Sequence, residues 1–351
     1  MRILLTGGTG YIGSHTAAAL VAAGHEVVCF DNLSNSRAEV MDRLEVITGQ
    51  KIPFVVGDIR DRAALEQTIR ERGIETVIHF AGLKAVGEAV AEPLTYYDNN
   101  VRGTLNLIEA MMACNVKTLV FSSSATVYGD PQYLPLDHAH PTSATNPYAR
   151  SKLMIEEMLS DVAATNDGWR IAVLRYFNPA GAHESGLIGE DPNGTPSNLM
   201  PFISRVASRR LEELSIFGGD YDTPDGTGAR DYVHVTDLAA GHIAALAAIT
   251  RSNNSLSTWN LGTGRGYSVL EMVEAFEDVN GVSVPYRIAE RRPGDIASSY
   301  ASPDNAKTEL GWEATLGLAE MCASMWRFER MLATSNNAEL QRRGILPHGA
   351  T

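Results

Sequence analysis

Short apolar runs alternate with helical stretches through the first half of the chain, and this alternation constrains the fold more than any other feature. Strand-like runs lie at Arg2–Thr6, Glu26–Asp31, Ile52–Val56, Thr76–Ala81, Thr118–Ser122 and Ile171–Tyr176. Helical patterns separate them at Ser14–Ala23, Arg62–Arg72, Tyr97–Cys114 and Tyr148–Ala164. Strands joined by helices of this length pair in parallel, and consecutive apolar residues are typical of strands covered on both faces. The sequence therefore predicts an α/β fold with a doubly wound parallel sheet.

The regular alternation weakens after about residue 180, where loops rich in Gly, Pro, Asp and Asn begin. Helical patterns return at Asp237–Thr250, Ser268–Asn280 and Leu318–Thr334. We expect a first domain over 1–180, which 231–265 rejoins through a strand near Thr258–Gly262. A smaller C-terminal α/β domain is expected over 181–230 and 266–334, with a polar, poorly ordered tail at 335–351. This division predicts a binding cleft between the two domains.

Composition excludes several classes of protein. The chain has 351 residues, 44% of them hydrophobic, yet no apolar run reaches the ~18 residues of a membrane span. A formal charge of −13 argues against general nucleic-acid binding, which depends on phosphate contacts. Cys29, Cys114 and Cys322 are scattered without CxxC spacing, which argues against a disulfide framework or a zinc site. No signal-peptide pattern precedes the first strand, so we expect a cytoplasmic protein.

His138 and His140, separated by one residue, are the one pair of histidines whose spacing suggests a metal site. They lie in a loop flanked by proline and have no supporting carboxylate or histidine cluster. We expect both to be exposed to solvent, and we expect no metal site.

A glycine string between the first strand and the first helix indicates a dinucleotide site. Gly7, Gly10 and Gly13 give GxxGxxG spacing. Glycine permits the tight turn and lets a pyrophosphate approach the backbone N–H groups at the helix N-terminus. Asp31 ends the second strand, where a carboxylate accepts hydrogen bonds from the adenosine ribose and repels a 2′-phosphate. These features predict a Rossmann-type fold that binds NAD in preference to NADP. Asp58, after the third strand, is expected near the adenine, although it could equally cap a loop.

Three further residues suggest proton transfer. Tyr148 and Lys152 stand at i and i+4, so they share one face of a helix. A nearby ammonium and a positive nicotinamide ring would both favour tyrosinate, and we therefore expect a lowered pKa for Tyr148. Ser124 follows an apolar strand, at the sheet edge where ligands bind in open α/β folds. Each feature alone also fits an ordinary surface helix or a capping serine.

Taken together, these segments resemble the extended short-chain dehydrogenase/reductase family, and within it the UDP-glucose 4-epimerases. The resemblance extends to about residue 330. It rests on the strings TGGTGYIGSHT, DNLSNS, GDIRD, HFAGLKAVGEAV, YYDNNVRGT, FSSSATVYGD, NPYARSK, LRYFNPAGAH, GEDPNG, NLMPF, GTGARDYVHV and RRPGD. One departure is Ala149-Arg150, where the family commonly has Gly-Lys. Neither position carries a proton, so the assignment is little affected.

The resemblance implies two sets of site residues. The NAD contacts would be Gly7, Gly10, Tyr11, Ile12, Gly13, Asp31, Asn32, Leu33, Ser34, Asn35, Ser36, Asp58, Ile59, Phe80, Ala81, Gly82, Leu83, Lys84, Asn99, Ser124, Tyr148, Lys152 and Phe177. The UDP-sugar contacts would be Lys84, Ser124, Tyr148, Asn178, Asn198, Leu199, Ile216, Phe217, Arg230, Tyr232, Arg292, Asp295 and Ser299. Arg230 and Arg292 are suitable donors to a pyrophosphate, although a structural ion pair, such as Arg230 with Asp231, would explain them equally.

The implied activity is that of an isomerase of galactose metabolism, with tightly bound NAD that is regenerated in each turnover. It would invert carbon 4 of a UDP-hexose through a transient 4-keto sugar and interconvert UDP-glucose and UDP-galactose. Tyr148 would act as the base, assisted by Ser124 and Lys152. A small residue such as Ser299 at its position in the family is associated with the additional use of UDP-GlcNAc and UDP-GalNAc. Tyr300 could instead fill that space.

Three other functions stay open at this level. A 4,6-dehydratase of the same fold would need an Asp-Glu pair where this chain has Ala125-Thr126. An enzyme acting on a UDP-uronate would need a further cation in the sugar pocket. A dinucleotide-sensing regulator would have no need of Ser124, Tyr148 and Lys152 together. The resemblance also implies a homodimer formed by the helices Tyr97–Cys114 and Tyr148–Ala164, whose apolar faces could otherwise pack only on the sheet.

Overall fold

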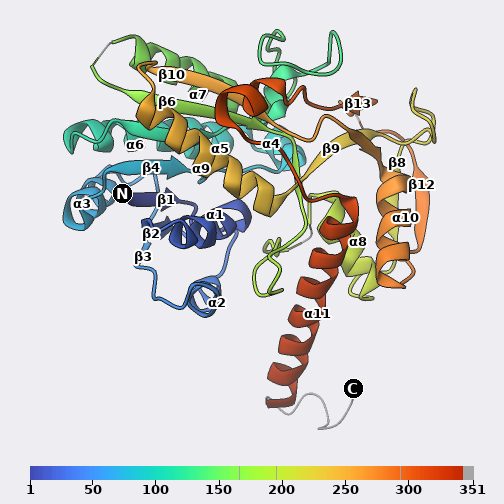
Figure 1. The fold of residues 1–351 in the computed structure, drawn as a ribbon. Coiled ribbons are helices and arrows are strands. Elements are labelled where there is room, and N and C mark those ends of the chain that lie inside the picture. Colours follow the sequence, from blue (N-terminus) through green and yellow to red (C-terminus); the bar gives the residue numbers. More distant parts are fainter. Residues whose placement is uncertain (166, 195, 293, 343–351) are drawn as a thin grey trace.

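The computed structural model describes residues 1–165, 167–194, 196–292 and 294–342, so the end of the expected tail, 343–351, lies outside it. Its main feature is a seven-stranded sheet in the order β10-β6-β5-β4-β1-β2-β3, with every neighbouring pair parallel (Figure 1). The strands are β1 (Arg2–Thr6), β2 (Glu26–Asp31), β3 (Phe54–Val56), β4 (Thr76–His79), β5 (Thr118–Ser122), β6 (Arg170–Tyr176) and β10 (Leu256–Leu261). This strand order is that of a Rossmann-type doubly wound sheet, extended by β10.

Helices cover both faces of this sheet. One layer contains α1 (Tyr11–Ala22), α2 (Glu39–Thr48) and α9 (Val235–Arg251); the other contains α3 (Arg62–Arg72), α6 (Gly103–Ala113) and α7 (Pro147–Ala164). Successive side chains of a strand point to opposite faces. In β1, Ile3 and Leu5 accordingly pack in the core beneath α1 and α9, whereas Leu4 packs in the core beneath α3 and α6. This two-sided burial explains why the strands are apolar at consecutive positions.

Shorter elements connect the helices of the second layer. They are α4 (Val86–Ala91), α5 (Pro93–Tyr96), the π-helical segment η1 (Tyr97–Arg102), which runs directly into α6, and the 3₁₀ segment η2 (Ala125–Tyr128). The stretch expected as one helix over Tyr97–Cys114 is therefore continuous but begins with a π-helical turn.

The remaining elements form a second, smaller layer beside the carboxyl end of the sheet. A small sheet joins β7 (Asn178–Ala180), β9 (Ala229–His234), β11 (Gly266–Ser268) and β13 (Ser298–Ser299), and β8 (Leu214–Phe217) pairs with β12 (Tyr286–Ala289). The helices of this layer are α8 (Leu199–Ala207), α10 (Val269–Asn280) and α11 (Leu318–Arg342), whereas the π-helical segment η3 (Ala306–Leu310) packs on α9. Met200, Phe276 and Phe328 belong to the separate hydrophobic core that holds this region together.

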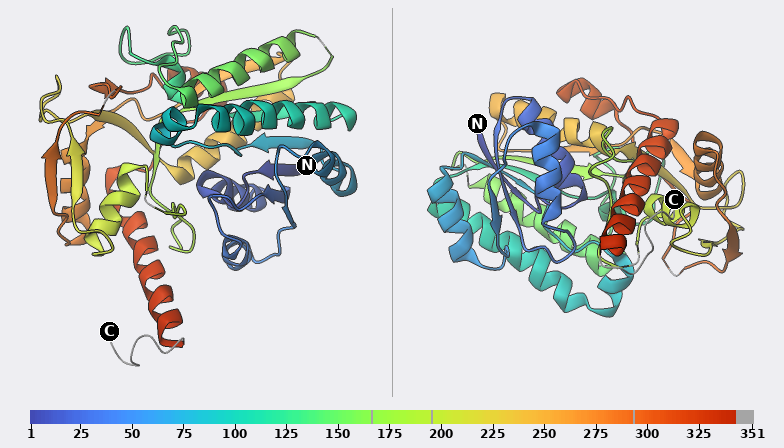
Figure 2. Two further views of the ribbon diagram at one scale, coloured as in Figure 1. Left: turned by 180° about the vertical axis from the view of Figure 1, so that it is seen from behind. Right: turned by 90° about the horizontal axis from the view of Figure 1, so that it is seen from below.

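Two features differ from the sequence expectations. Helix α11 continues to Arg342, so the first part of the expected tail is helical, and it extends beyond the body of the molecule (Figures 1 and 2). In addition, Ala306 and Trp312 pack in the core beneath α9 rather than in the core of the smaller region. The chain therefore returns to the first region between β13 and α11. No helix in the described part of the chain is long and apolar enough to cross a membrane.

A buried histidine at the end of β4 predicts a pH effect on stability. His79 is 1% exposed and lies between the hydroxyls of Thr6, at 2.6 Å, and Thr104, at 2.8 Å. Burial, aided by the charge of Lys152, lowers its pKa from 6.5 to about 3. Below pH 6.5 the unfolded chain therefore binds a proton that the folded chain does not, and stability is lost as the pH falls from 6.5 towards 3.

We expect the free energy of unfolding to fall by about 2 kcal/mol more between pH 7 and pH 5 in the wild type than in a His79→Gln variant. Guanidinium unfolding at the two pH values measures this difference. The exposed His138 supplies the control, because His138→Gln should keep the wild-type pH response. An equal fall in all three proteins would contradict the prediction.

Candidate functional site

The carboxyl edge of the large sheet faces the smaller region across a cleft of about 1690 Å³. The glycine loop after β1, the loop after β4, the end of β5 and helix α7 contribute residues from one side. Segments around β7, α8, β8, β9 and β13 contribute residues from the other side. The cleft therefore joins residues that lie as far apart in the sequence as Gly7 and Ser299.

The glycine loop is packed too closely for a side chain at Gly7 or Gly13. A Cβ on Gly13 would lie 2.1 Å from the carbonyl oxygen of Gly7, and a Cβ on Gly7 would lie 2.7 Å from the backbone nitrogen of Ala81. Gly7 also has a positive φ of +72°. Helix α1 begins within this tight loop. The N–H groups of its first turn and the helix dipole are suited to binding a pyrophosphate.

Asp31, at the end of β2, connects the glycine loop to the loop that follows β2. Its carboxylate accepts hydrogen bonds from the backbone N–H of Thr9, at 3.2 Å, and of Leu33, at 2.9 Å, and from the hydroxyl of Ser36, at 3.1 Å. The side chain is 8% exposed and lines the cleft. It therefore stands where a ribose held against the glycine loop would meet an acceptor.

Ser124, Tyr148 and Lys152 meet on the floor of the cleft. Asn146 caps the N-terminus of α7 by accepting from the N–H of Ala149 at 2.9 Å, which fixes the first turn that carries Tyr148. Ser124 ends the loop after β5, and its hydroxyl accepts from Thr126 Oγ1 at 3.0 Å. Lys152 Nζ donates to the carbonyl oxygen of Ser122 at 2.7 Å, which holds its ammonium at the end of β5.

The electrostatics of this trio are set mainly by burial. Burial raises the pKa of Tyr148, with a hydrogen bond from Ser124 acting in the opposite direction. Burial also lowers the pKa of Lys152 to about 8, opposed by the charge of Glu156. The protein by itself therefore raises the pKa of Tyr148, and the expected lowering, which included the positive nicotinamide ring, stays a prediction.

A buried polar cluster behind the trio was missed by the sequence reasoning. Glu156, one helical turn after Lys152, pairs with Arg175 at 2.6 Å and accepts from the hydroxyl of Ser123. Arg175 in turn donates to Tyr128 at 3.2 Å, and Tyr128 donates to Asn260 at 2.6 Å. The cluster fixes the backbone beside Ser124 from behind. The i+4 spacing of Glu156 from Lys152 was the available signal in the sequence.

The two arginines expected to bind pyrophosphate differ in their surroundings. Arg230 does not pair with Asp231; it donates to the carbonyl oxygens of Ala229, at 2.8 Å, and Ala297, at 3.4 Å. Asp231 instead accepts from the backbone of Thr263, Gly264 and Ala301. Arg292 pairs with Asp295 at 2.9 Å and stacks over the ring of Phe217. Both guanidinium groups line the cleft.

The cleft contains almost all of the predicted site residues. On the cofactor side it is lined by Gly7, Gly10, Tyr11, Ile12, Gly13, Asp31, Asn32, Ser34, Asn35, Ser36, Ile59, Phe80, Ala81, Gly82, Leu83, Lys84, Asn99, Ser124, Tyr148, Lys152 and Phe177. On the substrate side it is lined by Asn178, Asn198, Leu199, Ile216, Phe217, Arg230, Tyr232, Arg292, Asp295 and Ser299.

Two predicted residues, Leu33 and Asp58, are not part of the cleft lining. Asp58 pairs with Arg60 at 2.8 Å and accepts from Asn32 at 3.0 Å, and the Arg60 guanidinium holds the pKa of that carboxyl well below its usual range. Leu33 has a positive φ of 59° and donates its N–H to Asp31. Both residues shape the loops that follow β2 and β3.

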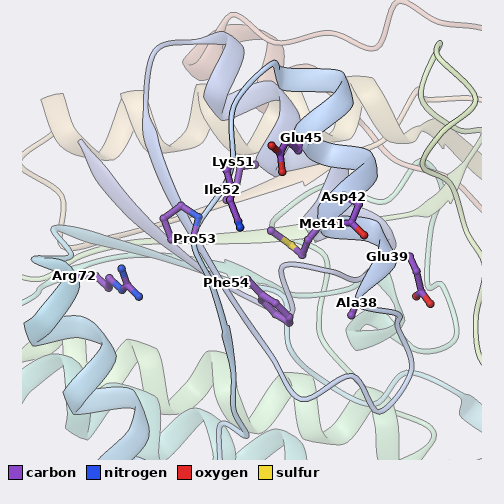
Figure 3. Close-up of a pocket in the computed structure, with 10 residues that line it drawn as sticks. All are labelled: Ala38, Glu39, Met41, Asp42, Glu45, Lys51, Ile52, Pro53, Phe54 and Arg72. Atoms are coloured by element: carbon purple, nitrogen blue, oxygen red, sulfur yellow. The ribbon is translucent and has the colours of Figure 1, made fainter.

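A second cavity, of about 620 Å³, contains none of the predicted site residues. It lies between α2 and the chain entering β3, as Figure 3 shows. Glu39, Asp42 and Glu45 border it on α2, and Lys51 and Arg72 border it elsewhere. The chemistry-bearing residues are therefore concentrated in the large cleft.

His140 corrects another expectation, because it is buried rather than exposed to solvent. Its exposure is 2%, its Nε2 accepts from the N–H of Gln132 at 3.0 Å, and its ring packs against Tyr128 and Tyr133. His138 is exposed, as expected. Among the described residues, no group of three or more His, Cys, Asp or Glu side chains could hold a metal ion.

Fold and cleft together define a dinucleotide-binding α/β protein whose cleft brings Ser124, Tyr148 and Lys152 together. A profile of the NAD dependent epimerase/dehydratase family matches residues 3–262, and the chain belongs to this family. It is 58% identical, over 94% of its length and 97% of the relative's, to a UDP-glucose 4-epimerase of Bacillus subtilis.

Solved structures agree with this assignment. A UDP-glucose-4-epimerase from Stenotrophomonas maltophila, with bound NAD and formylated UDP-arabinopyranose, superposes with a TM-score of 0.93 at 50% identity, covering 95% of this chain and 99% of the other. One from Bifidobacterium longum in complex with NAD+ and UDP gives 0.91 at 50% identity, covering 94% and 98%.

Proposed function

We propose that this chain inverts carbon 4 of UDP-hexoses and interconverts UDP-glucose and UDP-galactose with NAD as its resident cofactor. The observation that carries the proposal is the single cleft that holds the glycine loop, the Ser124–Tyr148–Lys152 trio and the two arginines. The relatives from Bacillus subtilis and Stenotrophomonas maltophila carry this activity in their names. The glycine cradle, which any Cβ at Gly7 or Gly13 would obstruct, suits a dinucleotide pyrophosphate.

When bound, NAD supplies a hydride acceptor and donor at carbon 4. Gly7, Gly13 and the N-terminus of α1 would hold its pyrophosphate, and Asp31 would accept from its adenosine ribose. Arg230 and Arg292 would hold the pyrophosphate of the sugar nucleotide through charge-assisted hydrogen bonds. The UDP would remain anchored by these arginines while the 4-keto sugar turns over and presents its opposite face.

The protein groups at the reacting centre handle the proton. The Tyr148 phenol oxygen takes it from the 4-hydroxyl and returns it after inversion, with Ser124 assisting. Since burial alone raises the pKa of Tyr148, the positive charges of Lys152, four residues further along α7, and of the bound cofactor must offset this rise. Ala125 and Thr126 line the cleft where a 4,6-dehydratase would need carboxylates, which favours epimerisation over elimination of water.

A Tyr148→Phe variant should lose at least ~10²-fold in the rate of UDP-galactose conversion, because the ring is kept and only the proton-transfer group is removed. Formation of UDP-glucose without net NADH measures the rate. Tyr286 is an exposed tyrosine on β12, and Tyr286→Phe should retain the wild-type rate. Near-normal turnover in Tyr148→Phe would refute the assigned base.

We further propose that the sugar range includes UDP-GlcNAc and UDP-GalNAc. Ser299 lines the cleft on β13, opposite Arg230 of β9. Tyr300 is not part of the cleft lining, and its ring lies toward Gly266, 3.4 Å from where a Cβ of that glycine would be. The space beside Ser299 is therefore not filled by its neighbour, which supports room for an N-acetyl group.

A Ser299→Tyr variant should lose activity on UDP-GalNAc by roughly 5- to 150-fold relative to UDP-galactose, since a phenol ring would occupy the space of the acetyl group. Rates on both sugars, in wild type and variant, give the ratio. A Ser299→Ala variant should keep both activities. The absence of wild-type activity on UDP-GalNAc would exclude this sugar range.

The assembly we propose is a homodimer formed through α6 and α7. Leu107 and Met111 of α6 are buried in the core beneath the sheet, whereas Leu105 and Met112 of the same helix are 44% and 54% exposed. Met154 on α7 is 42% exposed. Both helices thus pack on the sheet and still offer apolar side chains outward, as an interface between two copies would require.

Charge placed on this surface should produce monomers. We expect Leu105→Glu combined with Met112→Glu to halve the mass in light scattering at micromolar protein, because two desolvated carboxylates oppose the association. Val46→Glu, on an exposed valine of α2, should leave the mass unchanged. A monomeric wild type would reject the dimer.

The domain division at 1–180 with 231–265, against 181–230 with 266–334, is also a proposal. The separate hydrophobic core of the smaller region supports it, whereas the packing of Ala306 and Trp312 in the first core argues for moving that short stretch. We propose a cytoplasmic location as well, which the three unpaired thiols of Cys29, Cys114 and Cys322 suit.

A further inference from the structure

Two consecutive carboxylates, Glu190 and Asp191, connect the opposite sides of the cleft. Glu190 Oε1 accepts from Lys84 Nζ at 2.5 Å, in the loop after β4, and from Asn198 Nδ2 at 2.7 Å, at the start of α8 in the smaller region. Asp191 pairs through one oxygen with Arg37, at 3.5 Å, and through the other with Arg205 of α8, at 3.1 Å. Each carboxylate therefore has one partner on either side of the cleft.

Asn193, two residues after Asp191, adds two hydrogen bonds to the loop that follows β2. Asn193 donates its backbone N–H to Asn35 Oδ1 at 3.1 Å and its side-chain amide to the carbonyl oxygen of Ser34 at 3.3 Å. On the substrate side, Arg205 also donates to the carbonyl oxygens of Gly194, at 2.7 Å, and Pro192, at 3.3 Å. The bridging segment, defined as Glu190–Asn193, is held from both directions.

Glu190 is buried, so its hydrogen bonds are costly to break. The residue is 5% exposed, and its second oxygen, Oε2, is buried without a hydrogen-bond partner. A buried carboxylate oxygen without a donor is costly, so the side chain has little freedom to release Lys84 or Asn198. Moving either partner should therefore shift the other.

We propose that the bridging segment couples the binding of the two ligands, with Glu190 and Asp191 as positioning residues, so that a nucleotide bound in the substrate half slows release of the dinucleotide. The proposal rests on the proposed function, which places NAD on the side of Lys84 and Ser34–Ser36 and the UDP moiety on the side of Asn198. A ligand in one half of the cleft orders the side chains there that bind the bridging segment. The segment in turn binds side chains of the other half. The second ligand then binds a cleft that is already partly ordered, so less conformational entropy is lost when it binds. This coupling is the same in both directions.

The test measures release of NAD from the holoenzyme with and without UDP, a ligand that undergoes no turnover. Holoenzyme is diluted, free NAD is separated by centrifugal filtration at intervals, and the release rate is determined in each condition. In the wild type, we expect saturating UDP to slow release by 5-fold or more, within the usual range of coupling between sites.

Glu190→Gln and Asp191→Asn remove the charge at nearly constant shape and should each reduce this factor to below ~2-fold. A glutamine can still accept through one oxygen, but its amide places a donor where Oε2 stands and gives Lys84 no counter-charge. Glu184→Gln is the matched control, because Glu184 is exposed in the same loop. It should keep the wild-type factor.

A merely structural role would change the basal release rate or the melting temperature while leaving the UDP factor intact. The inference is overturned if UDP does not change the rate of NAD release from the wild type. It is also overturned if both variants keep the wild-type factor. Conversion of UDP-galactose by the same wild-type preparation is recorded separately. Conversion without coupling refutes only this inference, whereas coupling without conversion refutes the proposed activity.

Discussion

The parallel pairing of the seven-stranded sheet is the constraint on which the rest of the molecule depends. Because every strand runs in the same direction, every carboxyl end opens at one edge. Asp31 ends one strand, and Gly7, Lys84 and Ser124 follow three others, so all four reach the same cleft. The smaller region has only to cover this edge to complete a site with two halves.

Much of this arrangement could be predicted from the sequence because it depends on local patterns. The strands Arg2–Thr6 and Thr118–Ser122 and the helix Arg62–Arg72 were predicted with their observed bounds, since apolar runs and an N-capping Asp61 delimit them. Helix α11, by contrast, continues eight residues beyond the predicted Thr334, because a polar composition does not by itself end a helix.

What the sequence could not supply was the effect of surroundings formed by distant segments. His140 was expected at the surface from its loop composition, but Tyr128 and Tyr133 enclose its ring. The pKa of Tyr148 was expected to fall under the charges of Lys152 and of the nicotinamide ring, and the sequence did not reveal that burial in the folded cleft raises it. The partners of Glu190 lie 106 residues before it and eight residues after it, a pairing that no local pattern reveals.

The buried cluster of Glu156, Arg175, Tyr128 and Asn260 has a consequence for ionic strength. Mobile ions screen exposed charges over a Debye length of about 8 Å at physiological salt, but they hardly reach a pair whose side chains are 11% and 8% exposed. Arg292, with a side chain 57% exposed, remains open to such screening. Counter-ions therefore act on the proposed binding of an anionic ligand at Arg292, while the field of the buried pair near Lys152 is hardly changed by the salt of the medium.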